Sequence, residues 1–197
     1  MVGWKSFWWV VNPPYNGGFM SNYRRVFVEG GTYFFTVVLE NRQSDLLCQY
    51  IHEFRQAYAE TLSFYTFETI AICVLPDHFH WVVKLSENEK NYPKILHALK
   101  YNFTKRLPEN YKNPNQSKMN KQEFGVWQRR YWEHCVRDDL DLERHVFYTY
   151  FNPVKHGLVK SVKDWAFSSF HRDVKLGLLP LDWGVFSDNE WENLYSD

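Results

Sequence analysis

The sequence predicts an α+β fold in which two helices pack on one face of an antiparallel sheet. Aromatic and β-branched runs alternate with stretches of helical periodicity, and a Pro-Asp pair separates two of those runs as a hairpin turn would. In order, the predicted elements form a β-α-β-β-α-β pattern, the ferredoxin-like arrangement, followed by one additional C-terminal helix.

The first strand, the first helix and a hairpin are predicted between residues 33 and 85. Tyr33–Leu39 is aromatic and β-branched and follows a Gly-Gly pair, which favours a strand. Ser44 is placed to cap a helix whose apolar residues recur at helical spacing as far as Leu62. Residues 67–75 and 78–85 are predicted to be two strands joined tightly through Pro76-Asp77.

The remaining elements are predicted between residues 93 and 153. Pro93 opens a second helix that continues through Phe103. Residues 108–122 are rich in Asn, Lys, Gln and Pro and are expected to form a surface loop, and residues 124–136 contain a short fourth strand. Asp138 is expected to cap a third helix over 138–151, which Asn152-Pro153 should end because a residue before proline disfavours helical geometry.

The chain is expected to hold one domain with two tails. Residues 20–183 form the predicted folded domain, residues 1–19 a leader or flexible arm, and residues 184–197 a C-terminal tail. A hydrophobic share of 45% excludes a disordered chain, and the sequence contains no apolar run long enough to cross a membrane. Its three cysteines, Cys48, Cys73 and Cys135, form no C-x-x-C pair, so a reducing cytoplasm fits best.

The charge of the chain is distributed unevenly. The formal net charge is zero, but residues 89–172 hold 16 Lys and Arg against 9 Asp and Glu, while the rest holds 7 against 14. A basic stretch can bind phosphates in a protein that is neutral as a whole. A merely solvated polar face is the alternative.

His78 and His80 form a candidate metal site. Side chains alternate along a strand, so these two imidazoles share one face of the sheet, while Phe79, Trp81 and Val83 point to the face on which the helices should pack. Two adjacent imidazoles are suitable ligands for a divalent metal. The alternative is a pair of polar residues on an open, solvated sheet face.

Tyr148 and Asn152 form a second candidate group. They lie four residues apart on the last helix and therefore share a face, whereas Tyr150 points elsewhere. If that face lies against the sheet, Asn152 can supply a third ligand and Tyr148 lies beside the metal. Alternatively, Tyr148 is a core ring and Asn152 a helix cap before Pro153.

Six stretches give the sequence a specific resemblance. The chain resembles the REP-associated tyrosine transposases, a branch of the HUH single-strand transposase superfamily, over about residues 22–183. The stretches occur in the order expected of that family: Tyr23-Arg24-Arg25, residues 30–37 (GGTYFFTV), residues 75–80 (LPDHFH), residues 127–134 (WQRRYWEH), residues 148–157 (YTYFNPVKHG) and residues 164–170 (DWAFSSF).

The resemblance implies a function and a mechanism. It implies that His78 and His80 are the two-histidine metal motif, that Tyr148 is the nucleophile and that Asn152 is the polar residue four positions later. With Mg²⁺ or Mn²⁺ on these ligands, attack on a phosphodiester would leave a 5′-phosphotyrosine and free a 3′-hydroxyl. The implied substrates are repetitive extragenic palindromes, DNA hairpins with a short single-stranded 5′ tetranucleotide at the foot, in the cytoplasm of a bacterium and its nucleoid. The protein could work as a monomer or a homodimer.

Basic and aromatic residues supply candidate DNA contacts. Arg24 and Arg25 are expected to contact the foot of the hairpin. His134, His156 and His171 are further candidates, for which a structural or phosphate-contacting role is favoured. The expected phosphate contacts are Lys105, Arg106, Arg129, Arg130, Lys155 and Lys160, and the expected stacking residues are Trp127, Tyr131 and Trp132.

Two other functions are compatible with the same fold. A hairpin-binding module without catalysis would bind DNA regardless of metal, and the intact set of His78, His80, Tyr148 and Asn152 disfavours it. A metal-dependent hydrolase would use activated water and form no protein–DNA adduct, and the suitably spaced tyrosine disfavours it.

Overall fold

The computed structural model of this chain describes residues 25–121 and 123–184. The expected leader over residues 1–19, Arg24 and nearly all of the expected C-terminal tail lie outside these described residues. Among the helices of the described part, none is long and apolar enough to cross a membrane.

The sheet has the four predicted strands and confirms the ferredoxin-like arrangement. Every neighbouring pair is antiparallel, and the spatial order is β2-β3-β1-β4. Thr36 of β1 pairs with His80 of β3, which fixes the position of the His80 ring in the middle of the sheet. The strands are β1 (Thr32–Val38), β2 (Phe67–Val74), β3 (His78–Leu85) and β4 (Trp132–Cys135).

The helices between β1 and β4 differ from the prediction in two details, one in the first helix and one in the loop after the second. The first predicted helix is interrupted at Tyr50, so it consists of α2 (Leu46–Gln49) and α3 (Ile51–Phe64). The second is α4 (Tyr92–Arg106), with proline in its first turn as expected. The predicted loop after α4 contains two short helical turns, η1 (Glu109–Tyr111) and α5 (Gln116–Met119).

The third long helix, α6 (Asp139–Lys155), extends further than the sequence predicted. The side chain of Asp138 accepts a hydrogen bond from the Asp141 backbone and caps its start, as expected. Pro153 lies inside the helix, so the prediction that Asn152-Pro153 ends it was wrong. The helix ends instead at Lys155, and Gly157, with φ of 68°, follows two residues later. There the Gly157 and Leu158 amides donate to the carbonyls of Val154 and Pro153. This is the Schellman termination that glycine favours.

The segment after α6 covers the edge of the sheet. It contains η2 (Val162–Asp164) and α7 (Phe170–Lys175). The Val74 amide donates to the Phe167 carbonyl at 2.8 Å, and the Ser169 amide donates to the Ile72 carbonyl at 2.9 Å. The outer edge of β2 is thus partly paired, which protects an otherwise exposed strand edge.

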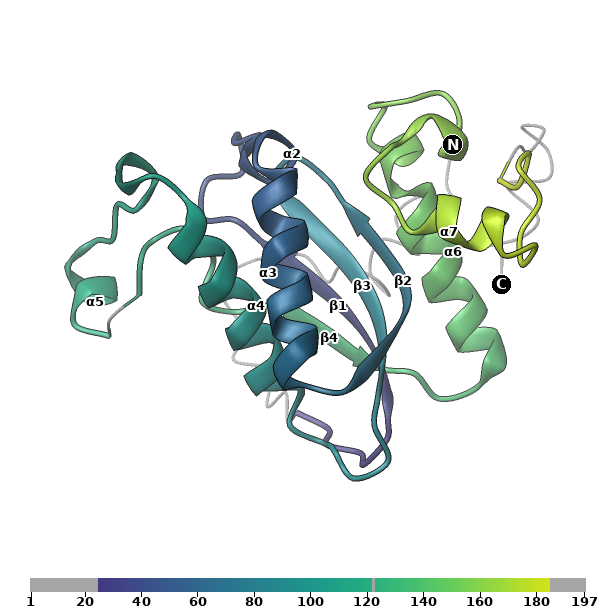
Figure 1. The fold of residues 1–197 in the computed structure, drawn as a ribbon, viewed down its shortest axis with the longest axis horizontal. Coiled ribbons are helices and arrows are strands. Elements are labelled where there is room, and N and C mark those ends of the chain that lie inside the picture. Colours follow the sequence, from purple (N-terminus) through teal and green to yellow (C-terminus); the bar gives the residue numbers. More distant parts are fainter. Residues whose placement is uncertain (1–24, 122, 185–197) are drawn as a thin grey trace, which may run out of the picture.

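Both faces of the sheet are covered. Phe79, Trp81 and Val83 belong to the core beneath α3 and α4, as predicted. Phe34 and Val82 belong to a second core on the opposite face, which α6 and the C-terminal segment complete. Figure 1 shows α3 and α4 on one side of the sheet and α6 and α7 on the other. The alternative of two polar residues on an open, solvated sheet face is therefore wrong, because this face is covered and both histidines are buried.

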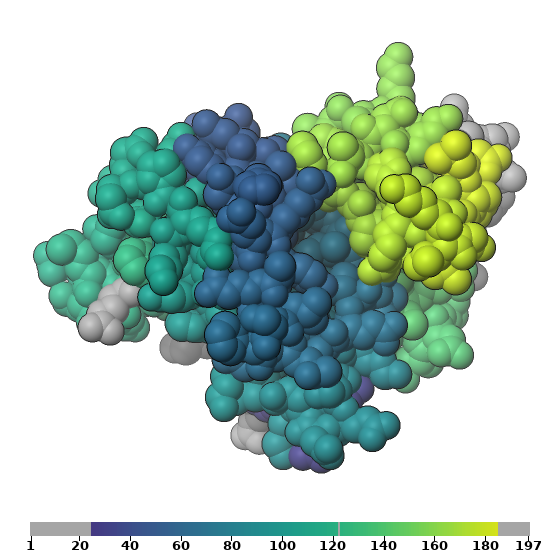
Figure 2. Space-filling view, in the orientation of Figure 1, coloured from purple at the N-terminus to yellow at the C-terminus, as the bar shows by residue number. Residues whose placement is uncertain are grey.

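The same division is visible on the surface. In the space-filling view, the blue surface of α2 and α3 lies next to the yellow-green surface formed by the C-terminal part of the chain (Figure 2). The teal surface of α4 and α5 lies on the far side of the blue surface, away from α6 and α7.

Candidate active site

His78 and His80 are held by two neighbouring polar side chains. His78 is 4% exposed and His80 is 1% exposed, and their ring centroids are 4.9 Å apart. Nδ1 of His78 lies 2.7 Å from the Asp77 carboxylate, and Nδ1 of His80 shares a 3.0 Å hydrogen bond with the Thr36 hydroxyl. Each ring is therefore oriented through Nδ1, which directs Nε2 away from the contact.

Burial and neighbouring charges act on the titratable groups around the two rings. Burial raises the pKa of Asp77, but the hydrogen bond and charge of His78 and the charge of Arg42 outweigh it and leave that pKa below its usual value. An ionised carboxylate only accepts hydrogen bonds, so Nδ1 of His78 is the donor of its contact with Asp77. Burial and the positive charges of nearby His78, His156 and Lys155 hold the pKa of His80 well below its usual range.

Asn152 completes a group of buried atoms that lack partners. Its side chain lies inside α6 and is fully buried, and neither amide atom has a hydrogen-bond partner. Nε2 of His80 is also buried and without one, although the Asn152 amide is close enough to raise the pKa of His80 slightly. Leaving such a group unsatisfied costs about 1–3 kcal/mol. The imidazole nitrogens and the amide oxygen fit a divalent cation, which would satisfy them.

Tyr148 lies against this group. It is 5% exposed, and its ring centroid is 5.0 Å from that of His80 and 5.8 Å from that of Phe34, with both neighbours meeting it edge to face. Asn152 follows one helical turn later on the same inner face of α6. The four residues that the sequence selected therefore lie together, and all four belong to one chain.

Two further residues beside the site come from the end of α6. The ring centroid of His156 is 5.4 Å from that of His78, and Nζ of Lys155 lies 4.6 Å from the ring centroid of Tyr148. The sequence had suggested a phosphate contact for Lys155 and a structural or phosphate-contacting role for His156. Asp77 and Thr36 were missed altogether: Asp77 precedes His78 directly, whereas the role of Thr36 depends on the pairing register of β1 with β3.

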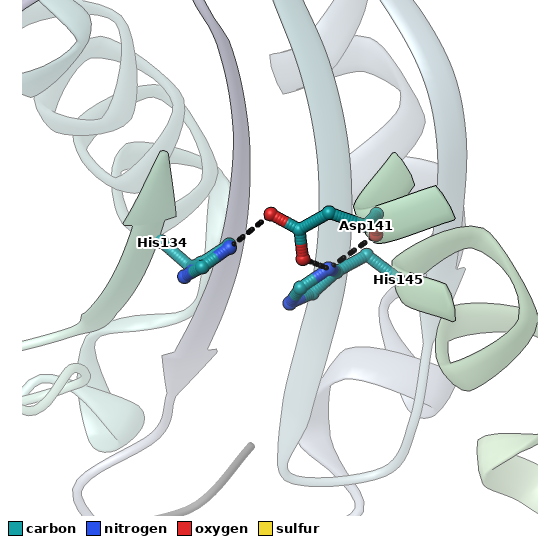
Figure 3. A group of neighbouring side chains, drawn as sticks. All are labelled: His134, Asp141 and His145. Carbon is teal, nitrogen blue, oxygen red and sulfur yellow. Dashed lines mark hydrogen bonds and ion pairs between the residues drawn. The ribbon is translucent and has the colours of Figure 1, made fainter. Parts of the chain in front are cut away.

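A second titratable group lies near the other end of α6. His134 of β4 and Asp141 and His145 of α6 have ligand atoms within 4.8 Å of one another (Figure 3). The rings of His134 and His145 are stacked, however, with centroids 4.5 Å apart and an angle of 16° between their planes. The lone pair of an imidazole nitrogen lies in the plane of its ring, so a bound ion must lie in that plane. Because these two ring planes are stacked and almost parallel, one ion cannot lie in both. His145 Nδ1 also lies 2.7 Å from the Asp141 carbonyl, so the group is a hydrogen-bonded network that attaches α6 to β4.

Replacing Asp141 by Asn is expected to destabilise the protein at neutral pH. Burial raises the pKa of Asp141, but the His134 hydrogen bond, the Arg137 amide and the histidine charges outweigh it and lower that pKa to about 2 from 3.8. The stabilisation from ionised Asp141 is fully present above the pKa that this carboxyl has in the unfolded chain, and it is lost as pH falls through about 2. It is worth roughly 2 kcal/mol at pH 7.

Urea unfolding of the wild type and of the Asp141→Asn variant between pH 7 and pH 2 checks this prediction. The gap in free energy of unfolding should close between about pH 4 and pH 2. Asp139→Asn, an exposed position in the same helical turn, is the matched control and should show little loss. A gap that stays constant with pH would refute this account of Asp141.

Three of the predicted DNA contacts lie away from the site. Lys105 and Arg106 belong to α4, on the opposite face of the sheet, and Arg106 is paired with Glu60 at 2.6 Å. Trp127 is 8% exposed and packs in the first core, where its indole nitrogen donates to the Thr104 hydroxyl at 3.0 Å. The prediction that Trp127 stacks on bases is therefore corrected, because its ring is part of the core.

The remaining candidates are more accessible. The guanidinium of Arg25 lies 4.7 Å from the ring centroid of Tyr131 and 3.5 Å from the Glu133 carboxylate. Arg129 is exposed but donates to both carboxylate oxygens of Glu123. Trp132 is half-buried against Phe34, and His171 bonds to the Trp165 carbonyl. Arg130 and Lys160 are exposed.

The chain is similar to known transposases along most of its length. The family described as "Transposase IS200 like" matches residues 27–148, which ends on Tyr148. A Haemophilus influenzae protein provisionally named as a REP-associated tyrosine transposase is 54% identical over 84% of this chain and 94% of its own length. The REP-associated tyrosine transposase of Escherichia coli K12 is 43% identical over 83% of this chain and 91% of its own.

A solved structure shows the same fold. It is a REP-associated tyrosine transposase bound to a REP hairpin, and it is 40% identical to this chain. The match has a TM-score of 0.73 and covers 85% of this chain and 93% of that protein.

Proposed function

The chain belongs to the IS200-like transposases, and within them to the REP-associated tyrosine transposases, and on that premise we propose that it cuts and rejoins REP-type hairpin DNA through Tyr148. The observation that carries the proposal is the position of Tyr148 against His80, with the unpartnered Asn152 amide one turn later. The hairpin substrate is inferred from the relative that was solved in complex with a REP hairpin.

The proposed step exchanges one phosphoester bond for another. The Tyr148 hydroxyl gives up its proton and its oxygen forms a bond to phosphorus, while the bond from phosphorus to the 3′-oxygen breaks. The departing oxygen takes up a proton to become a 3′-hydroxyl, so one proton is released and one is consumed. The product is a 5′-phosphotyrosine. Because the phosphoester is retained, a 3′-hydroxyl can attack it and rejoin the strand without a nucleotide cofactor.

His78, His80 and Asn152 are the residues that would hold Mg²⁺ or Mn²⁺. A divalent cation there would neutralise a non-bridging phosphate oxygen and act as a Lewis acid. Asp77 would fix the tautomer of His78, and Thr36 would orient His80. With 5% of its surface exposed, Tyr148 offers little to a substrate, so we expect DNA binding to shift the side chains around it.

We propose that the site works in cis and that the accessible cations contact the hairpin. Tyr148, His78, His80 and Asn152 meet within one chain, which a monomer satisfies and which a homodimer could also retain. Arg130 and Lys160 are the exposed candidates for phosphate contacts. Arg25 remains the candidate for the single-stranded foot, where DNA would compete with its contacts to Tyr131 and Glu133.

Cleavage of an end-labelled hairpin tests the proposal. With Mn²⁺, a hairpin that has a single-stranded 5′ foot should be cut, and a 3′-end label should migrate with the protein after denaturation. A 5′-end label should leave on a fragment that ends in a 3′-hydroxyl. A fully paired duplex of the same sequence is the control and should not be cut. Cleavage without an adduct would instead indicate a hydrolase, and binding without cleavage a non-catalytic module.

A further inference from the structure

Lys155 lies on the face of the Tyr148 ring. Its Nζ is 4.6 Å from the ring centroid, and its side chain is half-buried. An ammonium in this position is attracted by the electron-rich ring face. The sequence had suggested a phosphate contact for Lys155, whereas the structure places its charge on the side chain that the proposed function makes the nucleophile.

The length of α6 explains this position. Seven residues correspond to almost two full helical turns, so Lys155 and Tyr148 lie on the same face of the helix. The contact therefore depends on the helix continuing through Pro153 to its end at Lys155. Had α6 ended before Pro153, as the sequence suggested, Lys155 would not be held on this face.

The Tyr148 ring is fixed from several sides. Phe34 and His80 meet it edge to face, at interplanar angles of 79° and 74°, and Lys155 lies over its face. His78 and His156 are further titratable groups that act on His80, and their ring centroids lie 5.4 Å apart. Burial lowers the pKa of Lys155 to about 8, so most of this side chain remains positively charged at pH 7.

We propose that Lys155 is a positioning residue for Tyr148, which holds the ring in place and sets a positive charge over the ring whose oxygen attacks the phosphate. The inference rests on the proposed role of Tyr148 as nucleophile. A tyrosine hydroxyl gains negative charge as it attacks, and a fixed neighbouring cation stabilises that charge without reorganisation. A phosphate contact would instead contribute mainly to DNA affinity.

Single-turnover cleavage by Lys155→Met and Lys155→Arg tests the inference, with hairpin affinity measured separately. At saturating hairpin and Mn²⁺, the Met variant should cleave about tenfold to a hundredfold more slowly, a smaller loss than for a direct oxyanion donor. Its Kd for the hairpin should stay within about twofold, because Lys155 is turned toward Tyr148. The Arg variant, which keeps the charge, should recover most of the rate.

Lys163→Met is the matched control, since Lys163 is an exposed lysine of η2 outside the site, and it should cleave like the wild type. A Met variant that cleaves at the wild-type rate when saturated but binds more weakly would overturn the inference, as would an Arg variant as slow as the Met variant. If the wild type itself forms no adduct, the proposed function fails together with the inference. A wild-type adduct with an unimpaired Met variant contradicts the inference alone.

Discussion

Tyr148→Phe is expected to abolish hairpin cleavage and the covalent adduct. Phenylalanine lacks the oxygen that would bond to phosphorus, so the loss in single-turnover rate should be about a thousandfold or more. The ring contacts with His80 and Phe34 are retained, so the fold and the hairpin affinity should change little. Cleavage of labelled hairpin at saturating protein, with a separate binding titration, measures both effects.

Tyr150→Phe is the matched control for this substitution. Tyr150 lies two residues away on α6 and is fully buried, but its hydroxyl contacts Asp173 and Ser169 instead of the histidines. We expect a modest loss of stability, about 1 kcal/mol, with cleavage preserved. If the Tyr148 variant cleaves normally while the Tyr150 variant does not, the assignment of the nucleophile is wrong.

The second large effect concerns the proposed cation. Chelation, or the double substitution His78→Ala with His80→Ala, should lower the cleavage rate by about a hundredfold or more, since the phosphate charge would no longer be neutralised. Hairpin binding should persist after chelation. Because His80 is buried, a direct readout of metal binding is also needed.

Thermal unfolding in the presence of Mn²⁺ supplies that readout. A ligand at about a hundred times its Kd stabilises the folded protein by about 2.7 kcal/mol, which should raise Tm of the wild type by several degrees. The double variant should show no such rise, whereas His97→Ala, an exposed position on α4, should behave like the wild type. An equal rise in all three proteins would place the cation elsewhere.

The sequence predicted the position of the histidines because the sheet obeys a simple period. Alternation along 78–85 placed His78 and His80 on one face of the sheet. The structure confirms this, because Phe79 and Trp81 lie on the other face, in the core beneath α3 and α4. Helical spacing likewise placed Tyr148 and Asn152 on one face of α6. Both predictions depend only on local geometry.

The failures arose where packing overrides local preference. Pro153 normally disfavours a preceding helical residue, yet α6 is buried between the sheet and the C-terminal segment and continues to Lys155. The position of Lys155 at the site was missed for that reason. The WQRRY stretch predicted a nucleic-acid surface, but Trp127 is needed to fill the first core. No period in the sequence reports which aromatic residues a core requires.

Mapping of the protein–DNA adduct tests the central claim most directly. The wild-type protein would be trapped with hairpin DNA and Mn²⁺, digested with protease and nuclease, and analysed by tandem mass spectrometry. The account predicts a nucleotide remnant joined through its 5′-phosphate to the peptide that contains Tyr148, with the added mass on that residue. An adduct on Tyr150, Tyr131 or any other residue, or cleaved DNA with no modified peptide, would contradict it.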